Sequence, residues 1–131
     1  MSRRDLIDAT VNAKIVLANL WMCHFILWIF GDMFTLMQEM GESTDDVVIQ
    51  FVAPTTAIVL TLVVVFNLVG RPSLVRMVDM VLAVVYLLLN IGFFADATEG
   101  WEYYLGSLCV LFNVLIFWRA FTWPTEATPA N

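Results

Sequence analysis

The chain has 131 residues, of which 61% are hydrophobic and only 14% are charged, and its mean hydropathy is +0.85. Soluble domains are roughly 45–50% apolar, so this composition excludes an ordinary soluble domain and indicates a protein that lies in a lipid bilayer. The net charge of −6 would suit an acidic soluble protein, but the positions of the charges carry more information than their sum.

The first 14 residues are polar and carry three bases, Arg3, Arg4 and Lys14. The pair Arg3 and Arg4 has a passing likeness to a twin-arginine export signal. The apolar run that follows is longer than the core of a signal peptide and lacks a cleavage site of small residues. We therefore interpret residues 1–14 as an uncleaved cytoplasmic segment.

Four apolar segments follow, each long enough to cross a bilayer core of about 30 Å as a helix. They cover residues 15–37, 47–69, 74–95 and 103–123. Their connections are short, and residues 70–73 (Gly-Arg-Pro-Ser) combine a glycine that ends one helix with a proline that begins the next. The predicted fold is therefore all-α, an integral membrane four-helix bundle that runs up-down-up-down. We expect the polar tail, residues 124–131, to be disordered.

The basic residues predict the orientation in the membrane. All six Lys and Arg residues lie at the N-terminus, in or just after the turn between the second and third segments, or at the end of the fourth. The charged residues of the two other loops, 38–46 and 96–102, are all acidic. The positive-inside rule therefore predicts that both termini and the 70–73 turn are cytoplasmic. Trp101 and Tyr104 fit an aromatic belt at the outer interface.

Several polar side chains fall deep inside the predicted spans. Counting about 1.5 Å per residue from the span centres, His24, Tyr86 and Asn113 lie near the midplane, and Asn90 lies several Å toward the outside. Such groups are costly in lipid, so we expect them to face the other helices and to be paired there.

Helical spacing strengthens this expectation. His24, Trp28 and Asp32 stand at i, i+4 and i+8 and share one stripe, and Tyr86 and Asn90 share another. Stripes with polar groups at matching depth predict a polar midplane pocket that opens to the outside. The predicted ligand-binding residues are His24, Trp28, Asp32, Tyr86, Asn90 and Asn113. Pro54 would widen the pocket by kinking the second span at its missing bond to Gln50.

Two interpretations of these residues remain open. In the first, His24 hydrogen-bonds or titrates a ligand, since histidine is the side chain that changes charge near neutral pH. In the second, the same groups form interhelical hydrogen bonds that only hold the bundle together. A lone histidine without a second imidazole or thiolate at ligand spacing predicts no metal site. Cys23 and Cys109 also lack ligand spacing, so we interpret them as packing residues.

Near the cytoplasmic end, Asp79 lies one helical turn after Arg76 and level with Arg119. We predict an ion pair among these three residues. The sequence contains no Gly-rich phosphate loop, hydrolase triad or basic stripe, so we expect no catalytic site and no nucleic-acid partner. Small residues let helices approach closely, so Gly106 and Ser107 are candidates for a contact with a second copy of the chain.

A resemblance to a known family rests on four short motifs of the chain. They are Leu20-Trp21 and Gly31-Asp32-Met33 in the first span, Val69-Gly70-Arg71 at the basic turn, and Phe121-Thr122-Trp123-Pro124 after the fourth span. Together they resemble a family of uncharacterised bacterial four-span proteins, itself similar in size and layout to DoxX-like membrane proteins. The resemblance implies a four-helix protein of the bacterial inner membrane and offers no established activity. DoxX-like proteins are tied to quinone-linked or redox complexes, which supplies an analogy only.

The sequence supports two functional hypotheses of different classes. The first is a binding or accessory protein whose pocket takes a lipid, a quinone-like molecule or a protein partner. The alternative is a proton- or cation-coupled carrier of a small solute that uses His24 and Asp32. A membrane enzyme comes third, because the sequence offers no nucleophile–base pair. The sequence identifies no cofactor.

Overall fold

The computed structural model describes residues 11–38, 47, 50–51 and 53–123. Its elements are four helices: α1 (Ala13–Gln38), α2 (Ala53–Val69), α3 (Pro72–Ala95) and α4 (Gly100–Phe121). The prediction of an all-α chain with four helices is confirmed. The predictions for residues 1–10, for most of the first loop and for the tail at 124–131 lie outside the described residues.

Three of the helices are long and apolar enough to span a membrane. At about 1.5 Å per residue, the 26, 24 and 22 residues of α1, α3 and α4 extend about 39, 36 and 33 Å, against roughly 30 Å for a bilayer core. The 17 residues of α2 extend only about 26 Å. Gln50 and Phe51, just before α2, form a wider helical turn. Pro54 has no N–H to donate to the carbonyl of Gln50, which accounts for this wider turn.

Local sequence explains where three of the helices begin. Oδ1 of Asn12 accepts the backbone N–H of Lys14 at 2.9 Å and so caps α1. Pro72 occupies the first turn of α3, where its missing N–H costs nothing. Glu99 and Glu102 form a reciprocal capping box at the start of α4, where Oε2 of Glu102 accepts the N–H of Glu99 at 2.8 Å.

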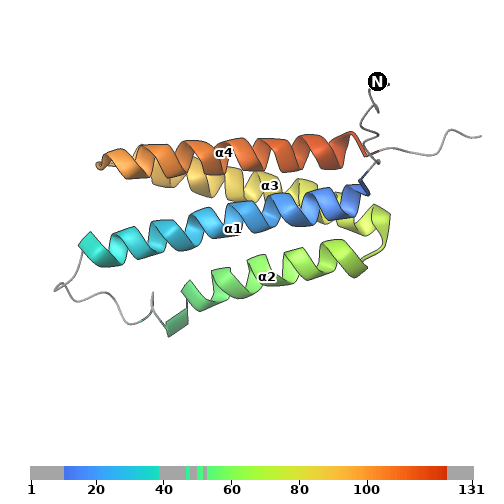
Figure 1. Cartoon of the computed structure of the whole chain (residues 1–131), viewed down its shortest axis with the longest axis horizontal. Helices are drawn as coiled ribbons and strands as arrows, with labels where there is room; N and C mark the ends of the chain where they lie inside the picture. Colours follow the sequence, from blue (N-terminus) through green and yellow to red (C-terminus); the bar gives the residue numbers. More distant parts are fainter. Residues whose placement is uncertain (1–10, 39–46, 48–49, 52, 124–131) are drawn as a thin grey trace, which may run out of the picture.

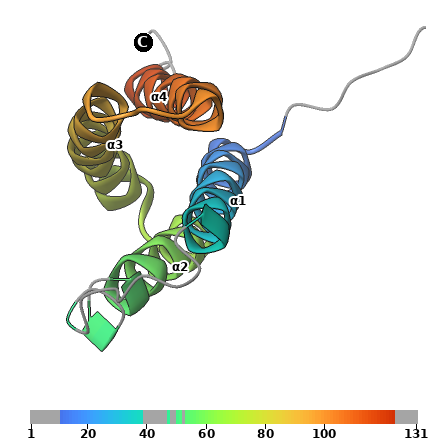
Figure 2. The same cartoon turned by 90° about the vertical axis from the view of Figure 1, so that its left-hand side faces the viewer.

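The four helices lie lengthwise beside one another (Figure 1). The start of α1, the α2–α3 turn and the end of α4 share one end of the molecule. α1 packs closely against both α2 and α4, whereas α3 packs closely against α4 and meets α1 mainly through long side chains. Figure 2, seen from the opposite end, shows α2 beneath α1 and apart from α3 and α4. α2 therefore joins the other helices mostly through α1.

The interior is unusually polar and the surface unusually apolar. All four helices contribute to one hydrophobic core, which includes Leu17, Trp21, Leu60, Val63, Val75, Ala83, Tyr86, Ile116 and Ala120. The polar residues buried with them are His24, Asn67, Asp79, Asn90 and Asn113. Large apolar side chains point outward instead; Leu88 is 64% exposed and Phe93 is 63% exposed. This distribution is the reverse of a soluble protein and suits helices surrounded by lipid.

Candidate functional site

His24 on α1 is fully buried at the centre of a hydrogen-bonded group. Its Nε2 atom lies 3.0 Å from Nδ2 of Asn90 on α3 and 3.3 Å from Nδ2 of Asn113 on α4. An amide nitrogen can only donate, so Nε2 accepts from both residues and the neutral ring carries its proton on Nδ1. One imidazole nitrogen therefore ties α1 to both α3 and α4.

Three aromatic side chains surround the imidazole. The ring centroids of Trp21, Trp28 and Tyr86 lie 5.7, 5.8 and 5.5 Å from that of His24. Trp28 also donates its indole N–H to Oδ1 of Asn90 at 3.1 Å. Asn90 therefore uses both ends of its amide, and the rings around His24 fix the position of the imidazole.

Five of the six predicted ligand-binding residues lie together here, and we call them the His24 cluster: His24, Trp28, Tyr86, Asn90 and Asn113. The sixth, Asp32, is exposed two helical turns beyond His24. Nδ1 of His24 and Oδ1 of Asn113 are buried and have no hydrogen-bond partner within the described part of the chain. The cluster therefore retains one donor and one acceptor that the described residues do not satisfy.

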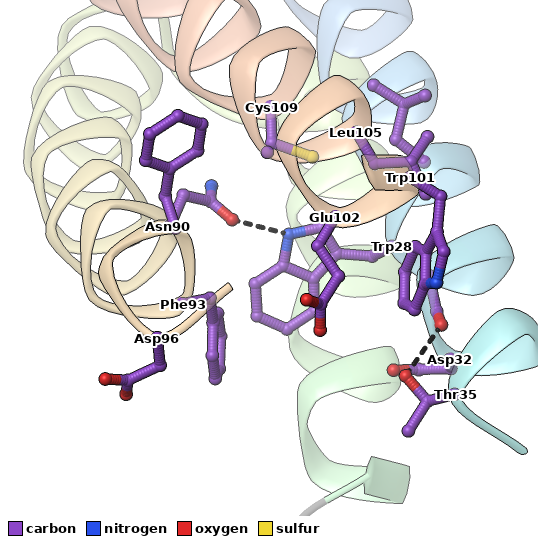
Figure 3. Close-up of a pocket in the computed structure, with 14 residues that line it drawn as sticks. Trp28, Asp32, Thr35, Asn90, Phe93, Asp96, Trp101, Glu102, Leu105 and Cys109 are labelled. Atoms are coloured by element: carbon purple, nitrogen blue, oxygen red, sulfur yellow. Dashed lines mark hydrogen bonds between the residues drawn. The ribbon is translucent and has the colours of Figure 1, made fainter. Parts of the chain in front are cut away.

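A cavity of about 300 Å³ lies between α1, α3 and α4 beside the His24 cluster (Figure 3). Trp28 and Asn90 belong both to the cluster and to the lining of the cavity, and buried Cys109 lines it at the same depth. The other lining residues come from the last turns of α1 and α3 and the first turns of α4: Leu27, Gly31, Asp32, Thr35, Phe93, Phe94, Asp96, Trp101, Glu102, Leu105 and Gly106. The six steps along the chain from Asn90 to Asp96 correspond to about 9 Å along a helix. The cavity lies at the small end of the range for small-molecule sites.

The mouth of this cavity is acidic. Asp32 on α1, Asp96 after α3 and Glu102 on α4 line it, and we call these three residues the acidic rim. Oε2 of Glu102 accepts the backbone N–H groups of Thr98 and Glu99 at 2.6 and 2.8 Å, so this carboxylate is held in position. In the part of the chain that the structure describes, no three His, Cys, Asp or Glu side chains are arranged to hold a metal ion.

Aromatic rings form much of the cavity wall between the acidic rim and the deep end of the cavity. The rings of Trp28 and Phe93 meet edge to face with centroids 5.8 Å apart. Trp101, from α4, packs against Phe34 of α1 at 5.4 Å. The cavity is therefore apolar and aromatic along its length, with carboxylates at one end and a neutral amide and thiol at the other.

Gly106 has a packing role inside the chain. A Cβ atom at this position would lie 2.9 Å from Cδ2 of Phe94 on α3. The absence of a side chain thus lets α3 and α4 approach closely beside the cavity. The sequence made Gly106 a candidate for a contact with a second copy, but its small size already serves the contact with Phe94.

No family model, curated protein or solved structure matches this chain. The site is therefore interpreted from its own chemistry. The DoxX-like layout stays a prediction from the sequence.

A second buried polar group lies closer to the α2–α3 turn. Oδ1 of Asp79, which is fully buried on α3, accepts the indole N–H of Trp21 at 2.9 Å and Nδ2 of Asn67 at 3.0 Å. Oδ2 of Asp79 and Oδ1 of Asn67 are buried and have no partner among the described residues. Because Trp21 also contacts the His24 ring, its side chain connects this group to the His24 cluster.

The structure does not bring Asp79 into an ion pair with Arg76 or Arg119 among the residues it describes. Arg76 donates instead to the backbone carbonyl of Phe121 at 3.2 Å. Asp79 and Arg76 stand three positions apart on α3, yet Asp79 points toward α1 and α2 while Arg76 reaches the end of α4. The hydrogen bonds of Asp79 therefore come from neutral donors.

Sequence reasoning missed one of the three aromatic partners of His24, Trp21, and two residues that line the cavity, Trp101 and Glu102. Trp21 stands three positions before His24, so helical spacing put it on the same face, but its link to Asp79 spans 58 positions of sequence. Trp101 was assigned to a membrane-interface belt, although it also lines the cavity. Glu102 was not predicted as a site residue because it falls in a loop by composition, whereas the capping box places it in the first turn of α4.

Proposed function

We propose that this protein is a multi-pass membrane protein that binds a small amphiphilic molecule in the cavity between α1, α3 and α4. It acts as a binding or accessory component of a bacterial inner membrane, and its four helices cross the bilayer up-down-up-down. The observation that carries the proposal is that Asn90 belongs to both the cavity wall and the His24 cluster. A molecule in the cavity would contact a side chain that is bonded to the only histidine.

The chemistry of the cavity supports a ligand with one polar and one apolar end. Its wall is formed largely by aromatic and aliphatic side chains, while Asp32, Asp96 and Glu102 give its mouth a polar rim. Membrane-soluble molecules such as lipids and quinone-like compounds combine these two properties. A protein partner would need an extended surface, whereas the cavity volume of about 300 Å³ suits a small molecule.

The distribution of charge supports an orientation with the cavity open to the outside. The bases Lys14, Arg71, Arg76 and Arg119 belong to one end; the Lys14 ammonium donates to the carbonyl of Gly70, and Arg76 donates to Phe121. The acidic rim belongs to the opposite end. By the positive-inside rule, the basic end with both termini faces the cytoplasm.

Native mass spectrometry of protein released from membranes in a mild uncharged detergent tests the binding function. We expect a stoichiometric small-molecule adduct on the wild type. The variant Leu105→Trp fills the cavity and should lose the adduct. Leu108→Trp, three residues along α4 on an exposed surface, makes the same substitution outside the cavity and should keep it. A protein without an adduct, or an adduct that persists in Leu105→Trp, would contradict the proposal.

One observation favours a proton- or cation-coupled carrier as the second candidate. Trp21 connects two buried titratable side chains, His24 and Asp79, each of which has an atom without a partner in the described residues. Unpaired ionisable groups inside a membrane are characteristic of ion pathways. If the protein is a carrier, solute flux into proteoliposomes should respond to a pH gradient and lose that response in Asp79→Asn. Flux that is insensitive to the gradient would eliminate this candidate.

A further inference from the structure

We propose that the cavity between α1, α3 and α4 selects a monovalent organic cation with an apolar body. The cation would lie at the acidic rim and the body along the aromatic wall. This inference rests on the proposed binding function and adds the charge and shape of the ligand.

The lining of the cavity has one sign of charge. Asp32, Asp96 and Glu102 come from three different segments, and none of the lining residues is a Lys, Arg or His. Figure 3 shows the Glu102 carboxylate between the rings of Trp28 and Trp101, whereas the Asp96 carboxylate points away from the other labelled side chains. Clefts lined by one sign of charge concentrate ions of the opposite sign, so this mouth attracts cations and repels phosphate or carboxylate head groups.

The acidic rim suits an organic cation better than a metal ion. A metal ion requires several oxygen, nitrogen or sulfur ligands converging on one point. The carboxylates of the described residues do not converge in this way. One of them, Glu102, already uses Oε2 to accept two backbone N–H groups. Carboxylates spread around a mouth can instead surround a quaternary ammonium group, whose charge is distributed over its alkyl substituents.

Aromatic faces supply a second attraction for the same ligand. Trp28 and Trp101 both line the cavity, and indole is the aromatic ring that attracts cations most strongly. Phe93 packs against Trp28 and extends the aromatic surface toward the rim. The rings can therefore accommodate the charged end near the mouth and apolar carbons below it.

The deep end of the cavity determines which chemical group the opposite end of the ligand can carry. Asn90 and Cys109 are buried and carry no formal charge, so a second charged group has no partner there. The distance from this level to the rim is about 9 Å, because six helical positions separate Asn90 from Asp96. A compound with one quaternary ammonium and a phenylalkyl chain of about this length fits the stated chemistry.

Three probes that share a 4-phenylbutyl body and differ in the charge of the head group test the inference: 4-phenylbutyltrimethylammonium, 4-phenylbutanol and 4-phenylbutanesulfonate. Their affinities are measured by isothermal titration calorimetry on the full chain in dodecyl maltoside, which is uncharged. We expect the cation to bind about tenfold more tightly than the alcohol, and the sulfonate to bind most weakly. The same measurement on Leu105→Trp shows whether the binding takes place in the cavity.

Two neighbouring acids provide a matched pair of variants. Asp96→Asn and Glu99→Gln each remove one negative charge from the same loop, but only Asp96 lines the cavity. Asp96→Asn should weaken the binding of the cation severalfold and leave the affinity for the alcohol unchanged. Glu99→Gln should change neither affinity. Glu102 is kept intact in these tests, because its carboxylate both lines the cavity and caps α4. Glu99 belongs to the same capping box, but in Glu99→Gln the amide oxygen can still accept the backbone N–H of Glu102.

The outcomes separate this inference from the proposed function. If all three probes bind equally and Leu105→Trp abolishes their binding, the cavity is a binding site without charge selection, so the inference fails and the proposed function survives. An anionic or neutral native adduct that Leu105→Trp removes would likewise overturn the inference and leave the proposed function standing. If no probe binds in a manner sensitive to Leu105→Trp and no native adduct is found, both proposals fail.

Discussion

Nδ2 of Asn90 lies 3.0 Å from Nε2 of His24, and this hydrogen bond joins α3 to α1, two helices whose backbones approach closely at few points and which meet through long side chains. Oδ1 of Asn90 accepts the indole N–H of Trp28, also on α1, so a single amide makes both connections. Because the same amide lines the cavity, one side chain belongs both to the packing of α3 on α1 and to the wall of the proposed binding site.

Replacing Asn90 by Leu should destabilise the fold by about 1–3 kcal/mol, because the imidazole and the indole N–H would be left buried without this partner. The measurement is the free energy of unfolding in SDS–detergent mixtures, followed by circular dichroism. The matched control is Asn19→Leu on α1, whose amide is exposed and bonds only its own helix at the carbonyl of Ile15. Equal losses of unfolding free energy in the two variants would show that the interhelical hydrogen bonds of Asn90 do not stabilise the fold.

Asp79 allows two substitutions with opposite expected effects. Asp79→Asn keeps the oxygen that accepts from Trp21 and Asn67, and its new amide can donate to the unpaired oxygen of Asn67. We expect this variant to be as stable as the wild type or more so. Asp79→Leu leaves the donors of Trp21 and Asn67 buried and unpaired, at a cost of about 1–3 kcal/mol. The same unfolding assay distinguishes them, and a well-folded Asp79→Leu protein beside an unstable Asp79→Asn protein would contradict this account.

Gly70 and Gly92 have different surroundings, so we expect substitution by alanine to have different effects at the two positions. A Cβ at Gly70 would lie 2.7 Å from the backbone oxygen of Phe66 and 2.7 Å from Cγ2 of Val75. Gly70→Ala should therefore cost about 1–3 kcal/mol, since a backbone atom in a tight turn cannot move aside easily. Gly92, within α3, has no atom within 4 Å of such a Cβ, and Gly92→Ala should stabilise the helix by about 0.4–1 kcal/mol. If thermal unfolding ranks the two variants in the reverse order, the turn does not have this geometry.

The sequence predicted the number and type of the elements well because long apolar runs and short polar loops have few alternative structures. It also brought His24, Tyr86 and Asn113 to similar depths, with Asn90 several Å nearer the outside, since the rise per residue in a helix is constant. It could not predict which way Asp79 points, because rotation of a helix about its axis depends on partners such as Trp21 and Asn67 far away in sequence. Periodicity alone gives weak guidance when a helix is apolar on all sides.

The cavity was predicted only in part for a related reason. Asp32 was expected at the mouth of a pocket, and it lines the mouth of the cavity. The predicted pocket surrounded His24 itself, whereas Asn90 and Trp28 separate the imidazole from the cavity by bonding to each other. Which side chains fill a space between helices depends on the distance between the helices. Close approaches such as that of Gly106 to Phe94 set this distance.

The proposed orientation can be tested by labelling single cysteines in a background of Cys23→Ser and Cys109→Ser. Thr98→Cys lies between α3 and α4 at the acidic end, and Ser73→Cys lies in the first turn of α3 at the basic end; both side chains are exposed. The positive-inside rule places the basic end in the cytoplasm and the acidic end outside. A membrane-impermeant maleimide should therefore label Thr98→Cys on intact cells and Ser73→Cys only after the membrane is permeabilised. A permeant maleimide serves as the control, because it should label both variants in either preparation. Labelling of Ser73→Cys but not Thr98→Cys on intact cells would invert the orientation, and the cavity would then receive its ligand from the cytoplasm.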